Sequence, residues 1–203
     1  MGPTRRVLIV LPEEVHLMDV AGPAQVFVNA ADIGARYDVG YVSERPTTAS
    51  HQGLGLSAPS QWPDLDPRDL VLVPGWRTRT DRTAAEPFSR RMLTRICEHW
   101  DNGGHLASVC AGSLALAHAG VLAGRAATTH HDLIGELARY PGVRSSAGRP
   151  VHVRAQAAHL GGNRQRHRPG PAPRCARPRS RARRPGGPCA RRARLAPRVR
   201  LAA

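Results

Sequence analysis

Residues 104–117 read GHLASVCAGSLALA and contain the signal that decides the fold. The apolar run from His105 to Val109 is short enough for one buried strand. The Leu- and Ala-rich segment from Ser113 to Ala119 is typical of a helix. Cys110 lies at the turn between them, in the spacing S-x-C-x-G. This pattern predicts a nucleophile elbow, a sharp strand-to-helix turn that exposes a reactive side chain.

Cys110 is the candidate nucleophile of this elbow. The small residues Ser108 and Gly112 flank it two positions away on either side, as a strained, exposed turn requires. The helix that follows would direct its unpaired N–H groups and its positive dipole end toward the sulfur, which favours the thiolate. The alternative is a buried structural cysteine that packs as a small hydrophobe.

The composition changes abruptly near Val143. Residues 1–143 contain 13 of the 30 Arg and all 15 acidic residues, whereas residues 144–203 contain the other 17 Arg and no acid. The net charge of +15 therefore comes from the last part of the chain. We expect one domain over residues 6–143 and an Arg/Pro/Ala-rich tail over residues 144–203. A disordered basic tail and a nucleic-acid-binding arm both fit this tail.

The four cysteines show neither a C-x-x-C pair nor zinc spacing, so we expect no disulfide framework and no metal site. Two of them, Cys175 and Cys189, lie in the tail. A reducing cytoplasm fits this usage best. The first apolar run, 7–11, is too short for a signal peptide, and no run reaches transmembrane length.

Strand and helix patterns alternate along the first 143 residues. This alternation predicts an α/β fold with a doubly wound, mostly parallel sheet and helices on both faces. The segment 53–63 is either a loop or a small hairpin. The other expected strands are 6–11, 37–43, 69–73 and 125–128, and the other expected helices are 22–31, 84–100 and 132–140.

Sites in such sheets form outside the carboxyl ends of the strands. Three of these ends carry candidate residues: the 12–19 loop with Asp19, the turn 74–76, and Cys110. Asp19 could instead be an ordinary helix N-cap, a position that favours Asp. His130 comes just before the expected helix 132–140 and could simply be an exposed turn residue.

The sequence resembles the PfpI superfamily of class I glutamine amidotransferase-like domains. The matching stretches are VLIVLPEEVHLMDVAGPAQVF (7–27), DLVLVPG (69–75) and ASVCAGSLALAHAGVLAGRAATTH (107–130). They are most similar to the branch that contains isonitrile hydratases and the N-terminal domains of AraC-type transcription regulators. The resemblance implies a flavodoxin-like fold whose C-terminal part is incomplete in this chain.

The resemblance also implies a site. Cys110 matches the nucleophile, Asp19 the carboxylate beside it, and the backbone N–H groups of Gly75 and Ala111 the oxyanion hole. His130, Trp76 and Gly112 are candidate pocket residues, and no cofactor is implied. Ala111 departs from the family pattern, in which proteases carry His and isonitrile hydratases carry Thr at this position. Protease activity is therefore not expected, and hydratase activity is the second alternative.

The first alternative is an amidase-like ligand-sensing domain of an AraC-type regulator. The expected partners are a small-molecule ligand and a second copy in a homodimer, with no membrane. Nucleic acid would be bound only through a helix-turn-helix domain, which we do not find in this chain. If the chain is an enzyme, it would be a cysteine-dependent hydratase or C–N hydrolase.

The resemblance offers a third interpretation of the tail, a shifted reading frame. Relatives carry a segment of the type TSAG…GIDLAL near this point. When the first base of the His159 codon is dropped, the codons permitted through Ala172 can spell TSAGIASGIDLAL. In this interpretation the restored frame would supply the last strands and helices of the fold.

Overall fold

We describe a computed structural model of the chain for residues 3–78, 88–145 and 153–154. Its main sheet has five strands in the order β2-β1-β5-β6-β9. The first four strands run parallel, and β9 pairs antiparallel with β6. The strands are β1 (Arg5–Leu11), β2 (Tyr37–Ser43), β5 (Leu70–Val73), β6 (His105–Ser108) and β9 (Val153–Arg154).

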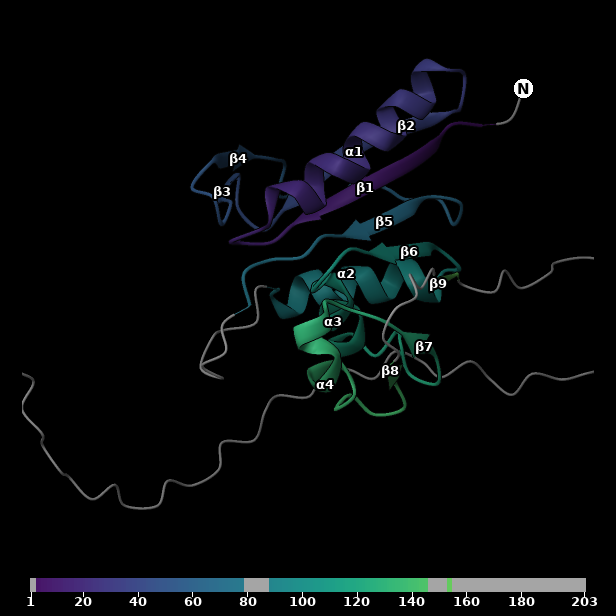
Figure 1. Cartoon of the computed structure of the whole chain (residues 1–203). Helices are drawn as coiled ribbons and strands as arrows, with labels where there is room; N and C mark the ends of the chain where they lie inside the picture. The colour runs from purple at the N-terminus through teal and green to yellow at the C-terminus, as the bar shows by residue number, and fades with distance from the viewer. Residues whose placement is uncertain (1–2, 79–87, 146–152, 155–203) are drawn as a thin grey trace, which may run out of the picture.

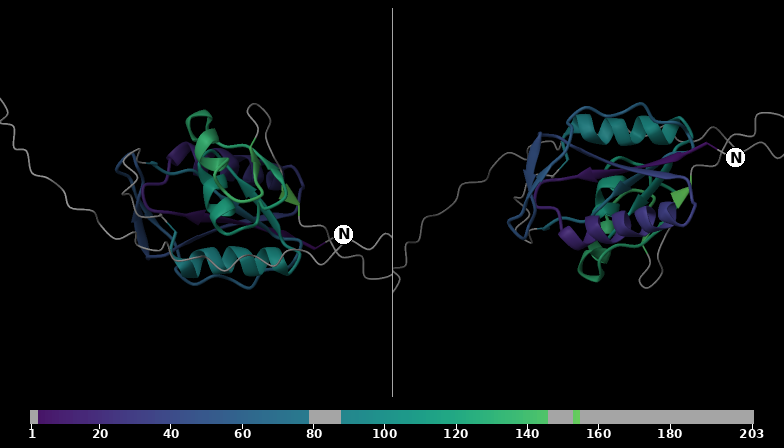
Figure 2. Two further views of the ribbon diagram at one scale, coloured as in Figure 1. Left: turned by 90° about the horizontal axis from the view of Figure 1, so that it is seen from below. Right: turned by 90° about the horizontal axis from the view of Figure 1, so that it is seen from above.

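Two long helices cover opposite faces of this sheet, as Figures 1 and 2 show. Helix α1 (Leu17–Asp32) packs on the face that presents Val7 and Ile9 of β1. Helix α2 (Arg90–Asp101) packs on the face that presents Leu8 and Val10. The alternation along β1 follows from the two-residue period of a strand, and burial on both faces explains its unbroken apolar sequence.

The remaining elements are short. They are β3 (Thr47–Ala49), β4 (Gly55–Ser57), α3 (Gly112–His118), β7 (Ala126–Ala127), the 3₁₀ turn η1 (His131–Leu133), α4 (Ile134–Leu137) and β8 (Arg144–Ser145). Strands β3 and β4 form an antiparallel hairpin. Only β4 lies in the expected 53–63 segment, which is therefore one strand of a hairpin followed by a loop. Strands β7 and β8 form a separate parallel pair.

Three expected boundaries were wrong. Helix α1 begins at Leu17 rather than near residue 22, and Pro23 lies inside it. Gly22 has no Cβ to meet the proline ring, so the backbone remains helical before Pro23. The expected helix 132–140 is a 3₁₀ turn followed by the short α4. Helix α2 begins at Arg90, where Ser89 accepts a hydrogen bond from the Met92 N–H as its N-cap.

The expected domain boundary at residue 143 and the tail interpretation stay predictions. Strands β8 and β9 lie beyond that boundary. Residues 79–87, which hold the start of the expected 84–100 helix, and residues 146–152 and 155–203 of the tail lie outside the described residues. Within the described residues, no helix combines the length and the apolar character that a membrane span needs.

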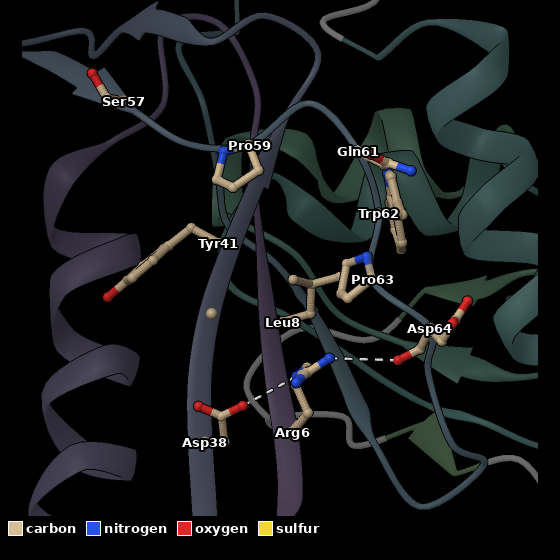
Figure 3. Close-up of a pocket in the computed structure, with 11 residues that line it drawn as sticks. Arg6, Leu8, Asp38, Tyr41, Ser57, Pro59, Gln61, Trp62, Pro63 and Asp64 are labelled. Carbon is tan, nitrogen blue, oxygen red and sulfur yellow. Dashed lines mark hydrogen bonds and ion pairs between the residues drawn. The ribbon is translucent and has the colours of Figure 1, made fainter.

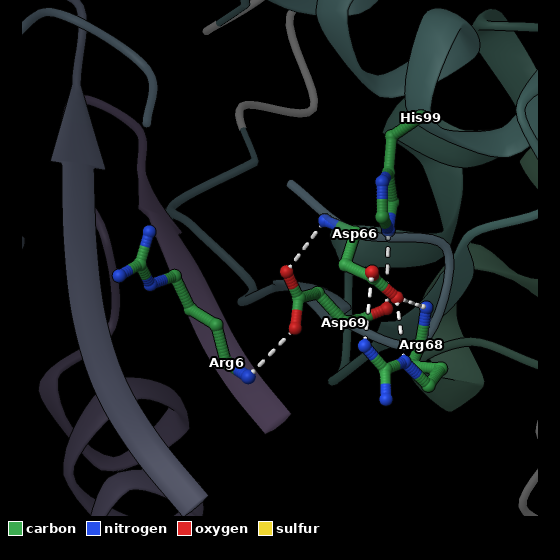
Figure 4. A network of polar contacts seen from close by, with 5 residues as sticks. All are labelled: Arg6, Asp66, Arg68, Asp69 and His99. Atoms are coloured by element: carbon green, nitrogen blue, oxygen red, sulfur yellow. Dashed lines mark hydrogen bonds and ion pairs between the residues drawn. The ribbon is translucent and has the colours of Figure 1, made fainter. Parts of the chain in front are cut away.

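A polar network fixes the amino ends of the strands (Figure 4). The buried carboxylate of Asp69 accepts hydrogen bonds from the backbone N–H groups of Arg6 and Asp66, each at 2.7 Å. The buried His99 ring reaches the Asp69 carbonyl oxygen through Nε2 at 3.1 Å. On the surface, hydrogen bonds from Arg68 lower the pKa of Asp66 to about 2.

Candidate functional site

The turn at Cys110 has the backbone conformation of a nucleophile elbow. Cys110 follows β6 and precedes α3 with φ of 52°, a left-handed value that side chains rarely adopt. The turn is anchored on β5, because the Val109 N–H donates to the Val73 carbonyl at 3.0 Å. A Cβ at Gly112 would overlap that same carbonyl oxygen, so this position requires glycine. Backbone strain of this kind persists where the surrounding structure enforces it.

Asp19 lies in the first turn of α1, beside the turn that follows β5. Its Oδ2 accepts a hydrogen bond from the Gly75 N–H at 3.2 Å. A Cβ at Gly75 would overlap Asp19 Oδ2 and would lie 2.9 Å from Cys110 Cβ and 3.1 Å from the Ala111 nitrogen. Asp19, Gly75, Cys110 and Ala111 therefore lie together, and the absence of a side chain at position 75 makes room for them.

Backbone pairing holds the loop after β1 against the loop after β5. The His16 N–H donates to the Gly75 carbonyl at 3.0 Å, and the Arg77 N–H donates to the Glu14 carbonyl at 2.9 Å. Val15 and Trp76 form an antiparallel bridge between these bonds. Because the two loops are paired through their backbones, the position of Asp19 relative to Gly75 does not depend on the 3.2 Å hydrogen bond alone.

The environment of Cys110 favours the neutral thiol. Burial raises the pKa of the Cys110 thiol, and the negative charge and hydrogen bond of Asp19 raise it further. The backbone N–H of Ala111 acts against this effect and lowers that pKa. The sequence analysis expected the helix end to favour the thiolate, but burial and Asp19 outweigh this effect and the pKa of Cys110 is raised.

Both backbone groups expected in an oxyanion hole have partners within the protein. The Gly75 N–H donates to Asp19, and the Ala111 N–H interacts with the Cys110 sulfur. An oxyanion hole needs N–H donors aimed at the position where negative charge develops on a substrate. In this structure the Gly75 donor is used by the Asp19 carboxylate, and the oxyanion-hole role of the two groups stays a prediction.

Two hydroxyl groups hold the elbow, and the sequence analysis missed both. Thr129 Oγ1 donates to the Cys110 carbonyl at 3.0 Å, and Ser113 Oγ donates to the same oxygen at 3.4 Å. Thr129 belongs to the ATTH motif, in which only His130 was singled out. A threonine two residues beyond a short strand carries no distinctive signal of its own, so only the fold reveals its contact.

Two further candidate residues, Trp76 and His130, contact side chains other than Cys110. Trp76 is buried in the core, where its ring meets Phe88 edge-to-face at 5.3 Å. His130 lies at an exposed turn, with its ring 4.1 Å from that of His131. Its hydrogen bond and ion pair within the described residues run to Asp132. Pocket roles for Trp76 and His130 stay predictions.

One group of potential metal ligands is present among the described residues. His130, His131 and Asp132 each offer a donor atom within 4.8 Å of the others, and all three are exposed. They are consecutive in one turn, with no ligand from another element. Such a group does not form the enclosed ligand set of a structural zinc site.

A flavodoxin-like sheet with a cysteine elbow and a carboxylate at its carboxyl edge defines the class: class I glutamine amidotransferase-like α/β proteins. The model of the DJ-1/PfpI family matches residues 5–154. The chain belongs to the DJ-1/PfpI family, as the sequence motifs predicted.

The chain is similar to two further proteins in sequence and to a solved structure in fold. An uncharacterized Streptomyces lividans protein from the cpoL 5' region is 34% identical over 144 residues, which cover 68% of this chain and 95% of that protein. Isonitrile hydratase of Pseudomonas putida is 30% identical over 133 residues, which cover 63% of this chain and about half, 54%, of the enzyme. The structure of an AraC family transcriptional regulator from Pseudomonas putida superposes with a TM-score of 0.56 at 24% identity. The match covers 71% of this chain and 77% of that one.

Proposed function

We propose that this chain is the ligand-sensing domain of an AraC-type transcription regulator, and that Cys110 binds rather than transforms a small molecule. One observation carries the proposal: the Gly75 N–H of the expected oxyanion hole already donates to Asp19 Oδ2 at 3.2 Å. A catalytic site would keep such donors available for the substrate.

The state of the sulfur supports the same proposal. Burial and Asp19 raise the pKa of Cys110, so the neutral thiol dominates at pH 7. The thiolate is the nucleophilic form of cysteine. A thiol that donates a hydrogen bond to a carboxylate is suited to contacting a bound ligand. It is poorly prepared to attack one.

The DNA that follows the His159 codon tests this proposal. Read in the frame that restores TSAGIASGIDLAL, it should continue through the end of the domain into a helix-turn-helix coding segment. A stop codon soon after the restored domain would contradict the regulator and leave a single-domain protein.

A cysteine-dependent hydratase is the second candidate, and the proximity of Asp19 to Cys110 favours it. In that reaction sulfur would attack the terminal carbon of an isonitrile, Asp19 would transfer protons, and water would release the N-substituted formamide. Incubation with an alkyl isonitrile distinguishes the candidates. We expect no more formamide from the wild type than from Cys110→Ala. Formamide production that depends on Cys110 would establish the hydratase.

A further inference from the structure

A second recess lies on the face of the sheet that α2 covers, away from the Cys110 site. It has a volume of about 660 Å³ and lies between β1, β2 and the segment 57–64 (Figure 3). Arg6, Leu8, Asp38 and Gly40 line it from the first four residues of each strand. The Cys110 site is at the carboxyl ends of β5 and β6, so the two sites are separate. A cavity of this volume accommodates a small organic molecule.

The floor of the recess is open because position 40 has no side chain. Gly40 pairs with Leu8 in the register of β1 and β2, and both face the recess. A Cβ at Gly40 would lie 3.9 Å from Leu8 Cδ1, an ordinary contact, and its φ is not in the left-handed region. The backbone therefore tolerates a larger residue here, and glycine is required neither by strain nor by packing.

The wall of the recess is apolar and held in place. Trp62 and the two prolines 59 and 63 line it. Trp62 packs against the core, and the Arg95 guanidinium lies 5.8 Å from its ring centroid. The Ser43 N–H donates to the Pro59 carbonyl at 3.0 Å and so ties this segment to the end of β2. A binding surface that is already ordered loses little conformational entropy when a ligand binds.

The charges in the recess sum to a negative value. Arg6 Nε is 3.1 Å from Asp38 Oδ2, and Arg6 also donates to the Asp64 backbone carbonyl at 3.5 Å. These contacts neutralise Arg6 and Asp38. Among the residues that the structure describes, the side-chain carboxylate of Asp64 has no hydrogen-bond or ion-pair partner. One negative charge therefore remains uncompensated at the edge of an apolar wall.

We propose that this recess binds a small organic cation with a flat apolar body. The planar part lies over Leu8 and Gly40 against Trp62, and the cationic group meets the carboxylate of Asp64. A flat ring is stabilised by apolar contact with the proline and tryptophan side chains, and a cation is attracted by the negative charge of Asp64. An anion of the same shape would make the same apolar contacts but would be repelled by Asp64.

Benzamidine and benzoate test this proposal, because they share a flat ring and carry opposite charges. Binding to the full-length chain is followed by two-dimensional NMR at millimolar probe, the range expected for so small a ligand. We expect benzamidine to shift the resonances of Gly40 and the Trp62 indole, and benzoate to leave them unmoved. Equal shifts with both probes, or none with either, would overturn the proposal.

Variants locate the binding. Gly40→Val should abolish the benzamidine shifts, since its side chain fills the floor while valine suits a strand. Asp64→Asn should weaken benzamidine about fivefold through loss of a charge contact. Asp32→Asn is the matched control, because it removes the same charge at the end of α1 on the opposite face. If circular dichroism shows that Gly40→Val does not fold, the affinity of Asp64→Asn for benzamidine tests the proposal in its place. If Asp64→Asn and Asp32→Asn bound benzamidine with equal affinity, the proposed site would be refuted.

Discussion

Asp19 Oδ2 lies 3.2 Å from the backbone nitrogen of Gly75, although 56 residues separate them in the sequence. This hydrogen bond joins the start of α1 to the turn after β5, directly beside the Cys110 elbow. The Asp19 carboxylate therefore holds two loops of the site together and also lies beside the sulfur. Asp19 both positions Gly75 and adds to the effect of burial in raising the pKa of Cys110.

Gly75→Ala should destabilise the protein and disrupt the site. The added Cβ would overlap Asp19 Oδ2 and would lie 2.9 Å from Cys110 Cβ, so one of the two loops must move. Overpacking of this kind costs about 1–3 kcal/mol. Urea denaturation followed by circular dichroism measures the loss.

Gly135→Ala is the matched control for this substitution. Gly135 lies inside α4, and beyond its chain neighbours and the backbone of its own helix no atom lies within 4 Å of a Cβ built there. The same chemical change should stabilise the helix by roughly 0.5–1 kcal/mol, because glycine is unfavourable in helix interiors. If Gly75→Ala proved as stable as Gly135→Ala, the close approach at Gly75 would be wrong.

Stability should decrease as the pH falls below about 6.5, the ordinary pKa of histidine. Burial lowers the pKa of His99 in the folded protein (Figure 4), so the unfolded chain takes up a proton there before the folded one does. Protons then favour unfolding until the pH falls below the lowered folded pKa. The free energy of unfolding, measured by urea titration between pH 8 and pH 5, should show this loss.

His99→Gln isolates the contribution of this residue from that of the other histidines. Glutamine can still donate a hydrogen bond to the Asp69 carbonyl, but it does not titrate. The variant should start from a lower stability at pH 8, because Gly104 is packed against the imidazole ring. Its stability should then fall less steeply with decreasing pH. If the free energy of unfolding of the variant and of the wild type fell equally with decreasing pH, His99 would not be responsible for the loss of stability.

Restoring the reading frame upstream of His159 should raise stability and soluble yield. Apolar side chains in α1 and at its C-cap are uncovered: Val26 is 65% and Ile33 88% exposed. Burial of such surface stabilises by about 25 cal/mol per Å². Thermal unfolding of the restored and original chains, expressed side by side, measures the difference. No gain in melting temperature would contradict the missing-core interpretation.

The sequence predicted the sheet because each parallel strand is a short apolar run bounded by turn residues. Strand β2 has the expected limits, Tyr37–Ser43. The start of α1 could not be predicted in the same way. Gly22-Pro23 is a typical helix start, and only the extended backbone of His16 shows that the helix begins earlier.

The candidate site was predicted in part. The spacing around Cys110 indicates the elbow, and the family motifs supply Asp19 and Gly75 as candidates. The partners of individual N–H groups could not be predicted, since they depend on ångström-scale distances between loops far apart in the sequence. The hydroxyl of Thr129 was missed for the same reason: its acceptor is a backbone carbonyl 19 residues away.

The pH dependence of Cys110 alkylation tests the central claim, that the site holds a neutral thiol beside Asp19. Iodoacetamide labelling, read by peptide mass spectrometry, gives the rate for each cysteine. We expect a Cys110 pKa above the roughly 8.5 of an unperturbed thiol and a lower value in Asp19→Asn, which removes the charge that raises it. Cys97, which is buried and donates to the Ala119 carbonyl at 3.1 Å, is the internal control and should not respond. A wild-type Cys110 pKa below 7, or one that Asp19→Asn leaves unchanged, would contradict the account.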